Sequence, residues 1–227
     1  MKGYIYMNYF IVGDVHGCLY TFQKLLKHWD PNTQRLIQVG DLVDRGNFIV
    51  ETIAYARAIQ TKYPSVVTFI LGNHEEDVLK QVESEESEAW MHFMGDETIR
   101  QYRKARKDIK EDIAWIDALP LFYEDDFIHV SHAGLSAYNE DPYQRESLIW
   151  HRSPIKNVGK TQVYGHTPLF DFKPMYDPMS NSYDIDTACV YGGKLTALVL
   201  DEQGKEIKVI QFDVDQRDIK ISLFTQA

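Results

Sequence analysis

The sequence predicts an α/β fold in which two β-sheets pack as a sandwich with helices on the outside. Over the first seventy residues, apolar runs with high β-propensity alternate with amphipathic segments. This pattern predicts the order strand, helix, strand, helix, strand. After Pro120 the pattern changes to a succession of short strand-like runs. No internal repeat, low-complexity linker or change of composition divides the chain, so one domain over residues 1–227 is expected.

The first half supplies three predicted strands and four predicted helices. The spacing of Leu19, Phe22 and Leu25 is typical of one face of a helix. Similar apolar spacing predicts helices over residues 18–29, 48–60, 73–90 and 96–119. Runs rich in β-branched and aromatic residues predict strands over residues 9–12, 35–39 and 66–71.

The second half is predicted to consist mainly of strands. These cover residues 121–123, 127–130, 162–164, 195–200 and 208–212. Residues 171–183 contain prolines and show no periodicity, so a loop at the rim of the site is predicted there. Two charged segments are expected to be exposed faces: the acidic run 83–88, and the basic residues Arg100, Arg103, Lys104 and Lys107.

The composition limits the partners and the compartment. The chain carries 24 basic and 34 acidic residues, a net charge of −10, which argues against a surface that coats nucleic acid. Cys18 and Cys189 form no CxxC motif and no disulfide framework, which favours a reducing compartment. The N-terminus is too polar for a secretory signal, and no apolar run is long enough to span a membrane. We therefore expect a cytoplasmic protein without nucleic-acid or membrane partners; Met7 is an alternative start site.

Each predicted strand of the first half is followed by a glycine-flanked loop with metal-ligating side chains. The loops are Gly13-Asp14-Val15-His16-Gly17, Gly40-Asp41-Leu42-Val43-Asp44-Arg45-Gly46 and Gly72-Asn73-His74-Glu75. Sites assemble at the carboxyl ends of strands in open α/β sheets. Because oxygen and nitrogen donors of this kind suit hard or borderline divalent cations, we expect a metal-dependent hydrolase.

Two later motifs extend the pattern. Ser131-His132-Ala133-Gly134 and Gly165-His166-Thr167 follow the three loops in order. Together the five motifs, over about residues 9–200, resemble the signature of phosphoprotein-phosphatase-type metallophosphoesterases, the calcineurin-like family. One such motif alone would be a weak signal, but five in the family's order are specific.

The resemblance implies a site for two divalent cations, with manganese expected and iron or zinc as alternatives. Asp14 and His16 would bind the first cation, and Asp41 would bridge both. The metal ligands implied in full are Asp14, His16, Asp41, Asn73, His132 and His166. Water activated between the cations would then attack phosphorus in line.

The same resemblance assigns the remaining chemistry. His74 would be the general acid, oriented by Asp44, although Asp44 has the alternative of pairing with Arg45. Arg45, Arg152 and Asn73 would hold phosphate oxygens, while the alternative for Arg152 is an ordinary surface arginine. No ligand role is expected for His28, His92, His129 or His151, although His151 could line the pocket.

Two substrate classes follow from two segments. The stretch Ile149-Trp150-His151-Arg152 resembles small bacterial and phage protein phosphatases that act on phosphoserine, phosphothreonine and sometimes phosphotyrosine. Residues 186–198 resemble symmetrical diadenosine tetraphosphate hydrolases, in which glycine is usual where Ala188 stands, so a crowded turn is expected. Tyr143, Tyr176 and Tyr183 are candidates for stacking on a purine. We favour the protein phosphatase, with the dinucleotide hydrolase as the alternative.

Other reaction classes lack their motifs. The sixth residue after Cys18 is Lys24, so a Cys-x5-Arg phosphatase is excluded, and Leu195 replaces the hydroxyl residue that a P-loop needs after Lys194. No Gly-x-Ser-x-Gly motif of a serine esterase occurs. A non-catalytic phosphoprotein-binding module is disfavoured because every ligand position and the acid His74 are filled.

Overall fold

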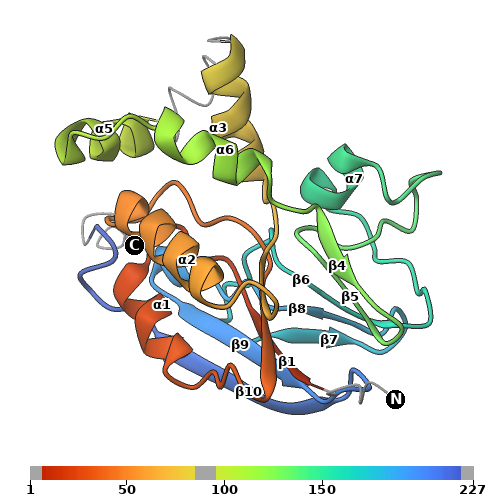
Figure 1. Cartoon of the computed structure of the whole chain (residues 1–227). Coiled ribbons are helices and arrows are strands. Elements are labelled where there is room, and N and C mark those ends of the chain that lie inside the picture. The colour runs from red at the N-terminus through yellow and green to blue at the C-terminus, as the bar shows by residue number, and fades with distance from the viewer. Residues whose placement is uncertain (1–6, 85–95, 221–227) are drawn as a thin grey trace.

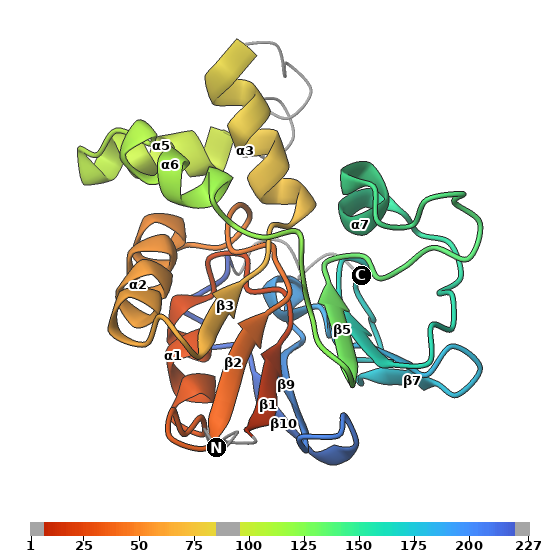
Figure 2. The same ribbon diagram turned by 45° about the vertical axis from the view of Figure 1, so that its right-hand side comes forward.

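The computed structural model describes residues 7–84 and 96–220, and it consists of two five-stranded sheets with helices around them (Figures 1 and 2). The strand order is β10-β9-β1-β2-β3 in the first sheet and β4-β5-β6-β8-β7 in the second. The predicted two-sheet α/β architecture is therefore confirmed.

The elements have the following bounds in chain order. In the first half they are β1 (Asn8–Val12), α1 (Leu19–Leu26), β2 (Gln34–Gln38), α2 (Ile49–Lys62), β3 (Val67–Phe69), α3 (Asn73–Ser84), α5 (Asp96–Ala105) and α6 (Lys110–Asp117). In the second half they are β4 (Phe122–Glu124), β5 (Ile128–Ser131), α7 (Arg145–Trp150), β6 (Thr161–Tyr164), β7 (Met175–Asp177), β8 (Ser182–Asp184), η2 (Cys189–Tyr191), β9 (Lys194–Leu200) and β10 (Glu206–Asp213).

Alternation along β1 explains how the layers are held together. Successive side chains of a strand point to opposite faces of the sheet. Tyr9 and Ile11 join the apolar cluster between the two sheets, which includes Val130 of β5. Phe10 and Val12 belong to the other cluster, which packs against α1 and α2. The central strand thus contributes to two cores, and burial on both faces is what its continuous apolar run requires.

Parallel pairing brings the important strand ends to one edge. In the first sheet β1 pairs with β2 and β2 with β3, all parallel. In the second sheet β5 pairs with β6 and β6 with β8, again parallel. The loops that follow these strands therefore gather at the carboxyl edges of both sheets, close to the beginning of α3 (Figure 2).

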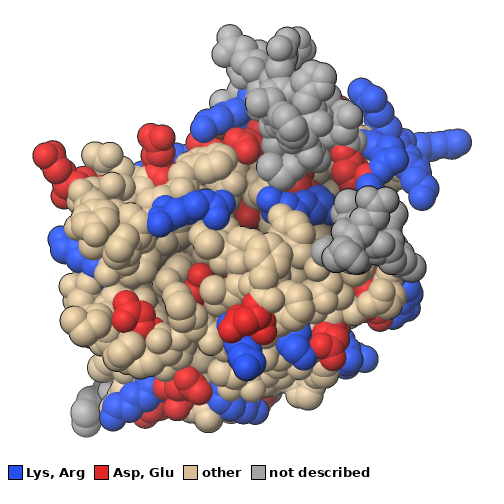
Figure 3. Space-filling view, turned by 180° about the vertical axis from the view of Figure 1, so that it is seen from behind, with Lys and Arg blue, Asp and Glu red and all other residues tan. Residues whose placement is uncertain are grey.

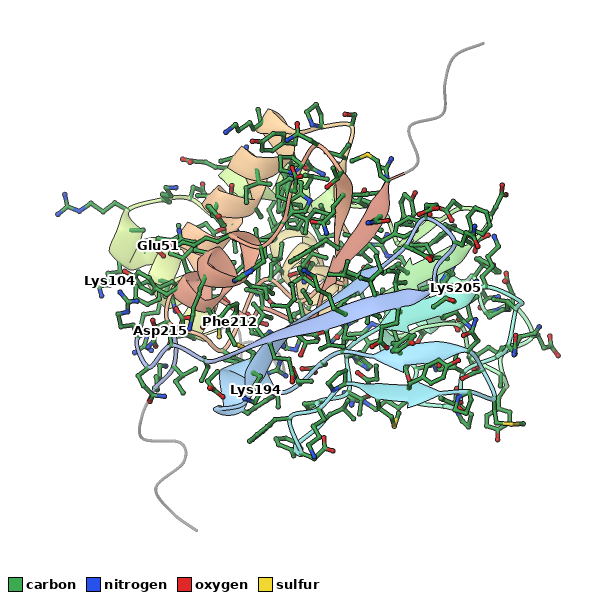
Figure 4. All side chains as sticks on the ribbon, turned by 90° about the horizontal axis from the view of Figure 1, so that it is seen from below. Glu51, Lys104, Lys194, Lys205, Phe212 and Asp215 are labelled. Carbon is green, nitrogen blue, oxygen red and sulfur yellow. The ribbon has the colours of Figure 1, made fainter. Side chains whose placement is uncertain are left out.

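The beginning of α1 depends on a residue far away in the sequence. Cys18 makes no side-chain capping bond, and Asp218 supplies the cap instead. The Asp218 carboxylate accepts hydrogen bonds from the backbone N–H of Tyr20 at 3.0 Å and of Thr21 at 2.8 Å, and from the Thr21 hydroxyl at 2.6 Å. Figure 4 shows the segment that precedes it, with Phe212 of β10 labelled beside α1. The chain after β10 is thereby fixed to the helix that follows the first site loop.

The predicted helix over residues 96–119 is wrong as a single element. It is divided into α5 and α6, and the break contains Arg106 with φ of 54°. The Asp108 side chain then accepts a hydrogen bond from the N–H of Lys110 at 3.0 Å and starts the second helix. A left-handed residue of this kind ends a helix but leaves no mark in the apolar spacing that predicted it. The helix predicted over 73–90 is present as α3 to Ser84, and its remainder lies outside the described residues.

The loop predicted over residues 171–183 is confirmed only in part, because β7 and most of β8 lie within it. Strands β7 and β8 pair antiparallel there, with Tyr176 opposite Tyr183. Each strand has only three residues, too few for a two-residue periodicity to be recognised. The hairpin forms the edge of the second sheet and does not line the site cavity described below.

The expected basic surface is present. Arg100, Arg103, Lys104 and Lys107 are all exposed, although Lys107 lies beyond the end of α5. The view from behind shows Lys and Arg side chains grouped where α5 projects (Figure 3). Helix α5 packs beside α2, and Figure 4 labels Glu51 on α2 and Lys104 on α5. Within the described part of the chain, no helix has the length and apolar character needed to cross a membrane.

Replacement of Asp218 by alanine is expected to destabilise the fold. It leaves two backbone N–H groups at the start of α1 without their acceptor, which costs about 1–3 kcal/mol in the free energy of unfolding. Urea unfolding followed by circular dichroism measures the change. Asp213→Ala is the control, since Asp213 pairs with Lys194 at an exposed position and its loss should not move the midpoint. Equal midpoints for all three proteins would contradict the capping role.

Candidate active site

The predicted site residues come together at the shared edge of the two sheets. The loops after β1, β2, β3, β5 and β6 carry, in that order, Asp14 and His16, Asp41, Asn73, His132, and His166. All six side chains are buried. Residues separated by as many as 152 positions are in contact, since the N–H of His166 donates to Asp14 at 3.2 Å.

Several of these residues have a backbone conformation that side chains disfavour. His16, Asp41, Asp44, Arg45 and His166 all have φ between 45° and 71°. Non-glycine residues in this left-handed region cost on the order of 1 kcal/mol or more each, and they cluster at functional sites because the surrounding structure holds them. The loops therefore depend on tertiary contacts.

Glu75 provides the most extensive of these contacts. Its fully buried carboxylate accepts hydrogen bonds from the N–H groups of Asp41, Leu42 and Val43 at 2.8–3.1 Å, and from that of Gly72 at 2.9 Å. Burial, followed by the repulsion of Asp41, raises the pKa of Glu75 to about 7. Glu75 thus joins the loop after β2 to the loop after β3. Sequence analysis included it in a motif but gave it no role.

Asp41 lies at the centre of the site. Its Oδ2 is 3.4 Å from His16 Nε2 and 3.8 Å from His74 Nε2, while its Oδ1 is 3.4 Å from His132 Nε2. Burial alone would raise the pKa of Asp41, but the surrounding imidazoles and Arg45 outweigh it and hold the pKa far below its usual range. The carboxylate is therefore ionised and faces ligand nitrogens on both sides.

Asn73 connects the two late histidines. Its side-chain Oδ1 lies 2.8 Å from His132 Nε2 and 2.9 Å from His166 Nδ1. Burial lowers the pKa of His132, and burial with the neighbouring His132 lowers that of His166 to about 3. Both imidazoles are thus neutral at physiological pH, which is the form that ligates a metal.

Backbone carbonyl groups fix the orientation of two imidazoles. His16 Nδ1 is 2.7 Å from the carbonyl oxygen of Val43, and His132 Nδ1 is 3.1 Å from that of Val39. With a cation bound, each ring would donate Nδ1–H to its carbonyl and keep the lone pair on Nε2, the nitrogen that faces Asp41. Such an outer hydrogen bond is usual for histidines that bind metals.

If all carboxyl groups of the site were ionised, their negative charge would exceed the positive charge of the protein groups around them. Burial, followed by repulsion from Asp186 and Asp41, raises the pKa of Asp14 well above its usual range, and burial raises that of Asp186 to about 7. Candidate ligand atoms of His16, Asp41 and His74 lie within 4.8 Å of one another, as do those of Asp14, Asp41 and His132. Buried carboxylates beside neutral imidazoles fit divalent cations, because the cation offsets the like charges.

His74 and Asp44 form a pair beside this cluster. His74 Nδ1 lies 2.6 Å from Asp44 Oδ2, and both side chains are buried. Burial lowers the pKa of His74, but Asp41 and the hydrogen bond to Asp44 outweigh that effect and raise it. The predicted pairing of Asp44 with His74 is therefore present in the structure.

The two arginines approach the site from different sides. Arg45 Nη1 contacts His16 Nε2, and its guanidinium carbon is 5.4 Å from the centre of the Tyr191 ring. Arg152 follows α7 and donates from Nη1 to the hydroxyl of Thr167 at 3.2 Å. Both side chains line the cavity described next.

A cavity of about 250 Å³ opens onto this cluster. Asp14 and His132 do not line it. Sequence analysis missed five wall residues: Asp77, Trp150, Pro168, Asp186 and Tyr191. Only Trp150 and the segment that begins at Asp186 carried a signal, because both belong to stretches quoted for the family resemblance. The complete lining is His16, Asp41, Arg45, Asn73, His74, Asp77, Trp150, Arg152, His166, Pro168, Asp186 and Tyr191.

The tyrosines considered for purine stacking do not reach the cavity. The Tyr143 hydroxyl donates a hydrogen bond to Glu124 at 3.0 Å, and the tilted rings of Tyr176 and Tyr183 pack against each other with centroids 4.5 Å apart. Aromatic type alone could not place them, and the cavity wall contains Trp150 and Tyr191 instead.

Three further histidines of the described ranges, His28, His129 and His151, do not line the cavity. His129 bonds to Glu124 and Ser131, and His151 to Ser153 and the carbonyl of Gly134. His28 is exposed just after α1, and His92 lies outside the described residues. Ala188 adopts the left-handed conformation that glycine would favour, with φ of 57°.

Comparison with known proteins identifies the fold and the family. A family model described as calcineurin-like phosphoesterase matches residues 7–210. The chain belongs to this family. It is 31% identical over 205 residues to serine/threonine-protein phosphatase 1 of Salmonella typhimurium, covering 82% of this chain and 88% of that protein. It is 28% identical over an alignment of 272 residues to a symmetrical bis(5'-nucleosyl)-tetraphosphatase of Methylobacillus flagellatus, covering 88% and 94%.

A solved structure agrees with this assignment. The chain matches a protein serine/threonine phosphatase from Saccharomyces cerevisiae with a TM-score of 0.65 at 16% identity, covering 95% of this chain and 82% of that one. At this identity the likeness concerns the fold. Family membership and the His/Asp cluster together show that the calcineurin-like phosphoesterase is a phosphoester hydrolase whose site is compatible with divalent cations.

Asp186→Asn is expected to change how stability depends on pH. In protein treated with EDTA, Asp186 titrates at about 7 when folded and near its ordinary value when unfolded. Between these values the folded state binds the extra proton, so rising pH destabilises the natural protein more than the variant, which keeps only the other raised carboxyl groups Glu75 and Asp14. The free energy of unfolding of the variant, relative to the natural protein, should rise by on the order of 1–3 kcal/mol between about pH 5 and about pH 8.

Thermal and urea unfolding at several pH values measure this difference. Asp177→Asn is the control, because the hydrogen bond from Ser180 lowers the pKa of the half-buried Asp177 carboxyl, so its charge does not change in this pH range. If the free energy of unfolding changed with pH in the same way in the natural protein and in the Asp186 variant, the raised pKa of Asp186 would be refuted.

Proposed function

We propose that this calcineurin-like phosphoesterase removes phosphate from phosphoserine and phosphothreonine side chains, and also from phosphotyrosine, with two divalent cations bound at the sheet edge. The supporting observation is that the Asp41 cluster and the His74–Asp44 pair meet at one small cavity. A charge-stabilising centre and a proton donor then act on the two sides of one phosphorus atom.

The metal assignment follows the donor set. Asp14 and His16 would hold one cation, Asn73, His132 and His166 the other, and Asp41 both. These cations, manganese being the first expectation and iron or zinc the alternatives, would supply Lewis acidity and lower the pKa of water. The buried, neutral imidazoles and the ionised Asp41 are ready to bind without a change of protonation, whereas Asp14, whose pKa is raised, would lose its proton to the incoming charge.

His74 would donate the proton that the leaving oxygen needs. Asp44 holds Nδ1, so the proton on Nε2 faces the cavity beside Asp41. The raised pKa of His74 favours the protonated form near neutral pH, as a general acid requires. A serine or threonine alkoxide is a poor leaving group, so this proton contributes directly to the rate.

Arg45, Arg152 and Asn73 would bind the phosphate oxygens. The two guanidinium groups can each meet two oxygens, and both line the cavity. Arg45 contacts His16 Nε2, the nitrogen assigned to a cation, so Arg45 must swing from that atom toward the phosphate when the site is loaded. The Tyr191 ring lies beside the guanidinium and can support it.

The cavity size favours a phosphorylated side chain over a dinucleotide. About 250 Å³ is below the range of roughly 300–1,000 Å³ that is usual for drug-sized ligands, and two nucleosides joined by four phosphates are larger still. The similarity to the Salmonella phosphatase over most of both chains supports the same choice.

A symmetrical dinucleoside tetraphosphatase is the second candidate. Trp150 and Tyr191 place two aromatic rings at the cavity wall, where a purine could stack. The Methylobacillus relative, whose name states that activity, is matched over nearly its whole length. For either activity we propose one catalytic domain over residues 1–227 that acts in the cytoplasm.

His74→Asn is expected to lower kcat on a phosphothreonine peptide by about two to three orders of magnitude while metal content is unchanged. The variant loses the proton donor but retains all six proposed ligands. Steady-state kinetics together with elemental analysis of the same preparation test this. Turnover close to that of the natural protein, at equal metal content, would refute the role of His74.

The substrate class is tested by comparing the rates on the two candidate substrates. With manganese supplied, kcat/KM on a phosphothreonine peptide is expected to exceed that on diadenosine tetraphosphate by at least about tenfold, because the cavity holds the side chain but not both nucleosides. Phosphate release and chromatography of nucleotides measure the two reactions. The reverse ratio would select the second candidate.

A further inference from the structure

Thr98 contacts the catalytic pair from outside every motif discussed above. It lies in the first turn of α5 and is fully buried. Its hydroxyl Oγ1 donates a hydrogen bond to Asp44 Oδ1. The other oxygen of the same carboxylate, Oδ2, is the one that holds His74 Nδ1 at 2.6 Å. Thr98, Asp44 and His74 therefore form a continuous hydrogen-bonded chain that ends at the cavity.

The geometry of Asp44 explains why a second anchor matters. Asp44 has φ of 66° in a loop, so regular secondary structure does not set the direction of its side chain. The terminal torsion of an aspartate is broad, and each hydrogen bond to the carboxylate narrows the range of that rotation. A hydrogen bond at Oδ1 restricts that rotation, and the position of the His74 imidazole follows from it.

Helix α5 is itself fixed to the loop that carries Asp44. Gln101, one turn after Thr98, donates from Nε2 to the carbonyl of Gly46 at 2.7 Å. Its Oε1 accepts from the N–H of Ile49 at 2.7 Å. These bonds hold the helix in register with the loop, so the Thr98 hydroxyl arrives at Asp44 in a fixed position.

We propose that Thr98 is a positioning residue of the hydrolysis, which holds Asp44 so that His74 presents its proton to the leaving oxygen. This inference rests on the proposed function of the site. Thr98 does not line the cavity, and it acts only through Asp44. Outer hydrogen-bond partners of this kind are typically worth 10–100-fold in activity.

Thr98→Val tests the hydroxyl with little change of shape. We expect kcat on a phosphothreonine peptide, whose leaving group needs a proton, to fall by about 10–100-fold with KM nearly unchanged. Turnover of 2,4-dinitrophenyl phosphate, whose leaving group departs without a proton, should fall less than about threefold. Thr98→Ser keeps the hydroxyl and is expected to restore most of the peptide activity.

Thr52→Val is the matched control. Thr52 is a fully buried threonine in α2, and its Oγ1 has no hydrogen-bond partner among the described residues. This variant undergoes the same chemical change in a neighbouring helix, so it should keep both activities. Circular dichroism and metal analysis of each variant show whether the fold and the metal content are preserved.

A second measurement, by proton NMR, detects the hydrogen bond between His74 and Asp44 without any substrate turnover. The downfield proton resonance of His74 Nδ1–H, assigned by its loss in His74→Asn, reports the bond to Asp44. It should shift or broaden in Thr98→Val and stay in place in Thr98→Ser and Thr52→Val. If the natural protein hydrolyses none of the phosphoesters, the proposed function fails, and this resonance still decides whether Thr98 positions the pair.

Three results would overturn the proposal. The first is an equal loss on both substrates in Thr98→Val, which would indicate a general structural effect. The second is full peptide activity in that variant. The third is an unchanged His74 resonance in Thr98→Val.

Discussion

The structure depends on holding an ionised, buried Asp41 against three imidazoles at the joint edge of two sheets. Burying an isolated, ionised carboxylate costs free energy, and the left-handed backbone conformation of Asp41 adds to that cost. Glu75 makes the arrangement stable because its carboxylate takes up four backbone N–H groups from two loops. Once these loops are fixed, the parallel strands bring the late histidines to the other side of Asp41.

Much of this centre could be predicted from the sequence because strand ends and loop motifs are local signals. Asp14, Asp41, Asn73 and the two late histidines follow predicted strands, and the topology brings those strand ends together. The metal and catalytic roles rested on a family resemblance, and the structure adds their distances. What local signals could not show was the complete cavity wall, since Tyr191 and Pro168 come from segments far from α3 and meet it only in the folded chain.

The errors in the predicted elements have the same origin. The hairpin of β7 and β8 was missed because its strands are too short for a periodic pattern. The break between α5 and α6 depends on the backbone of Arg106, an ordinary residue in a left-handed conformation. The role of Thr98 could not be predicted for a further reason. This donor to Asp44 belongs to α5, which begins 52 positions after Asp44 in the sequence.

The five site residues with a left-handed backbone affect the stability of the fold as well as its chemistry. Five such residues together store several kilocalories per mole in the folded chain, at roughly 1–2 kcal/mol each. A cation that binds only the folded form returns part of that energy by mass action. With the proposed cations bound, the folded form would then be more stable than without them, so scarcity of metal would lower the folded population together with the rate.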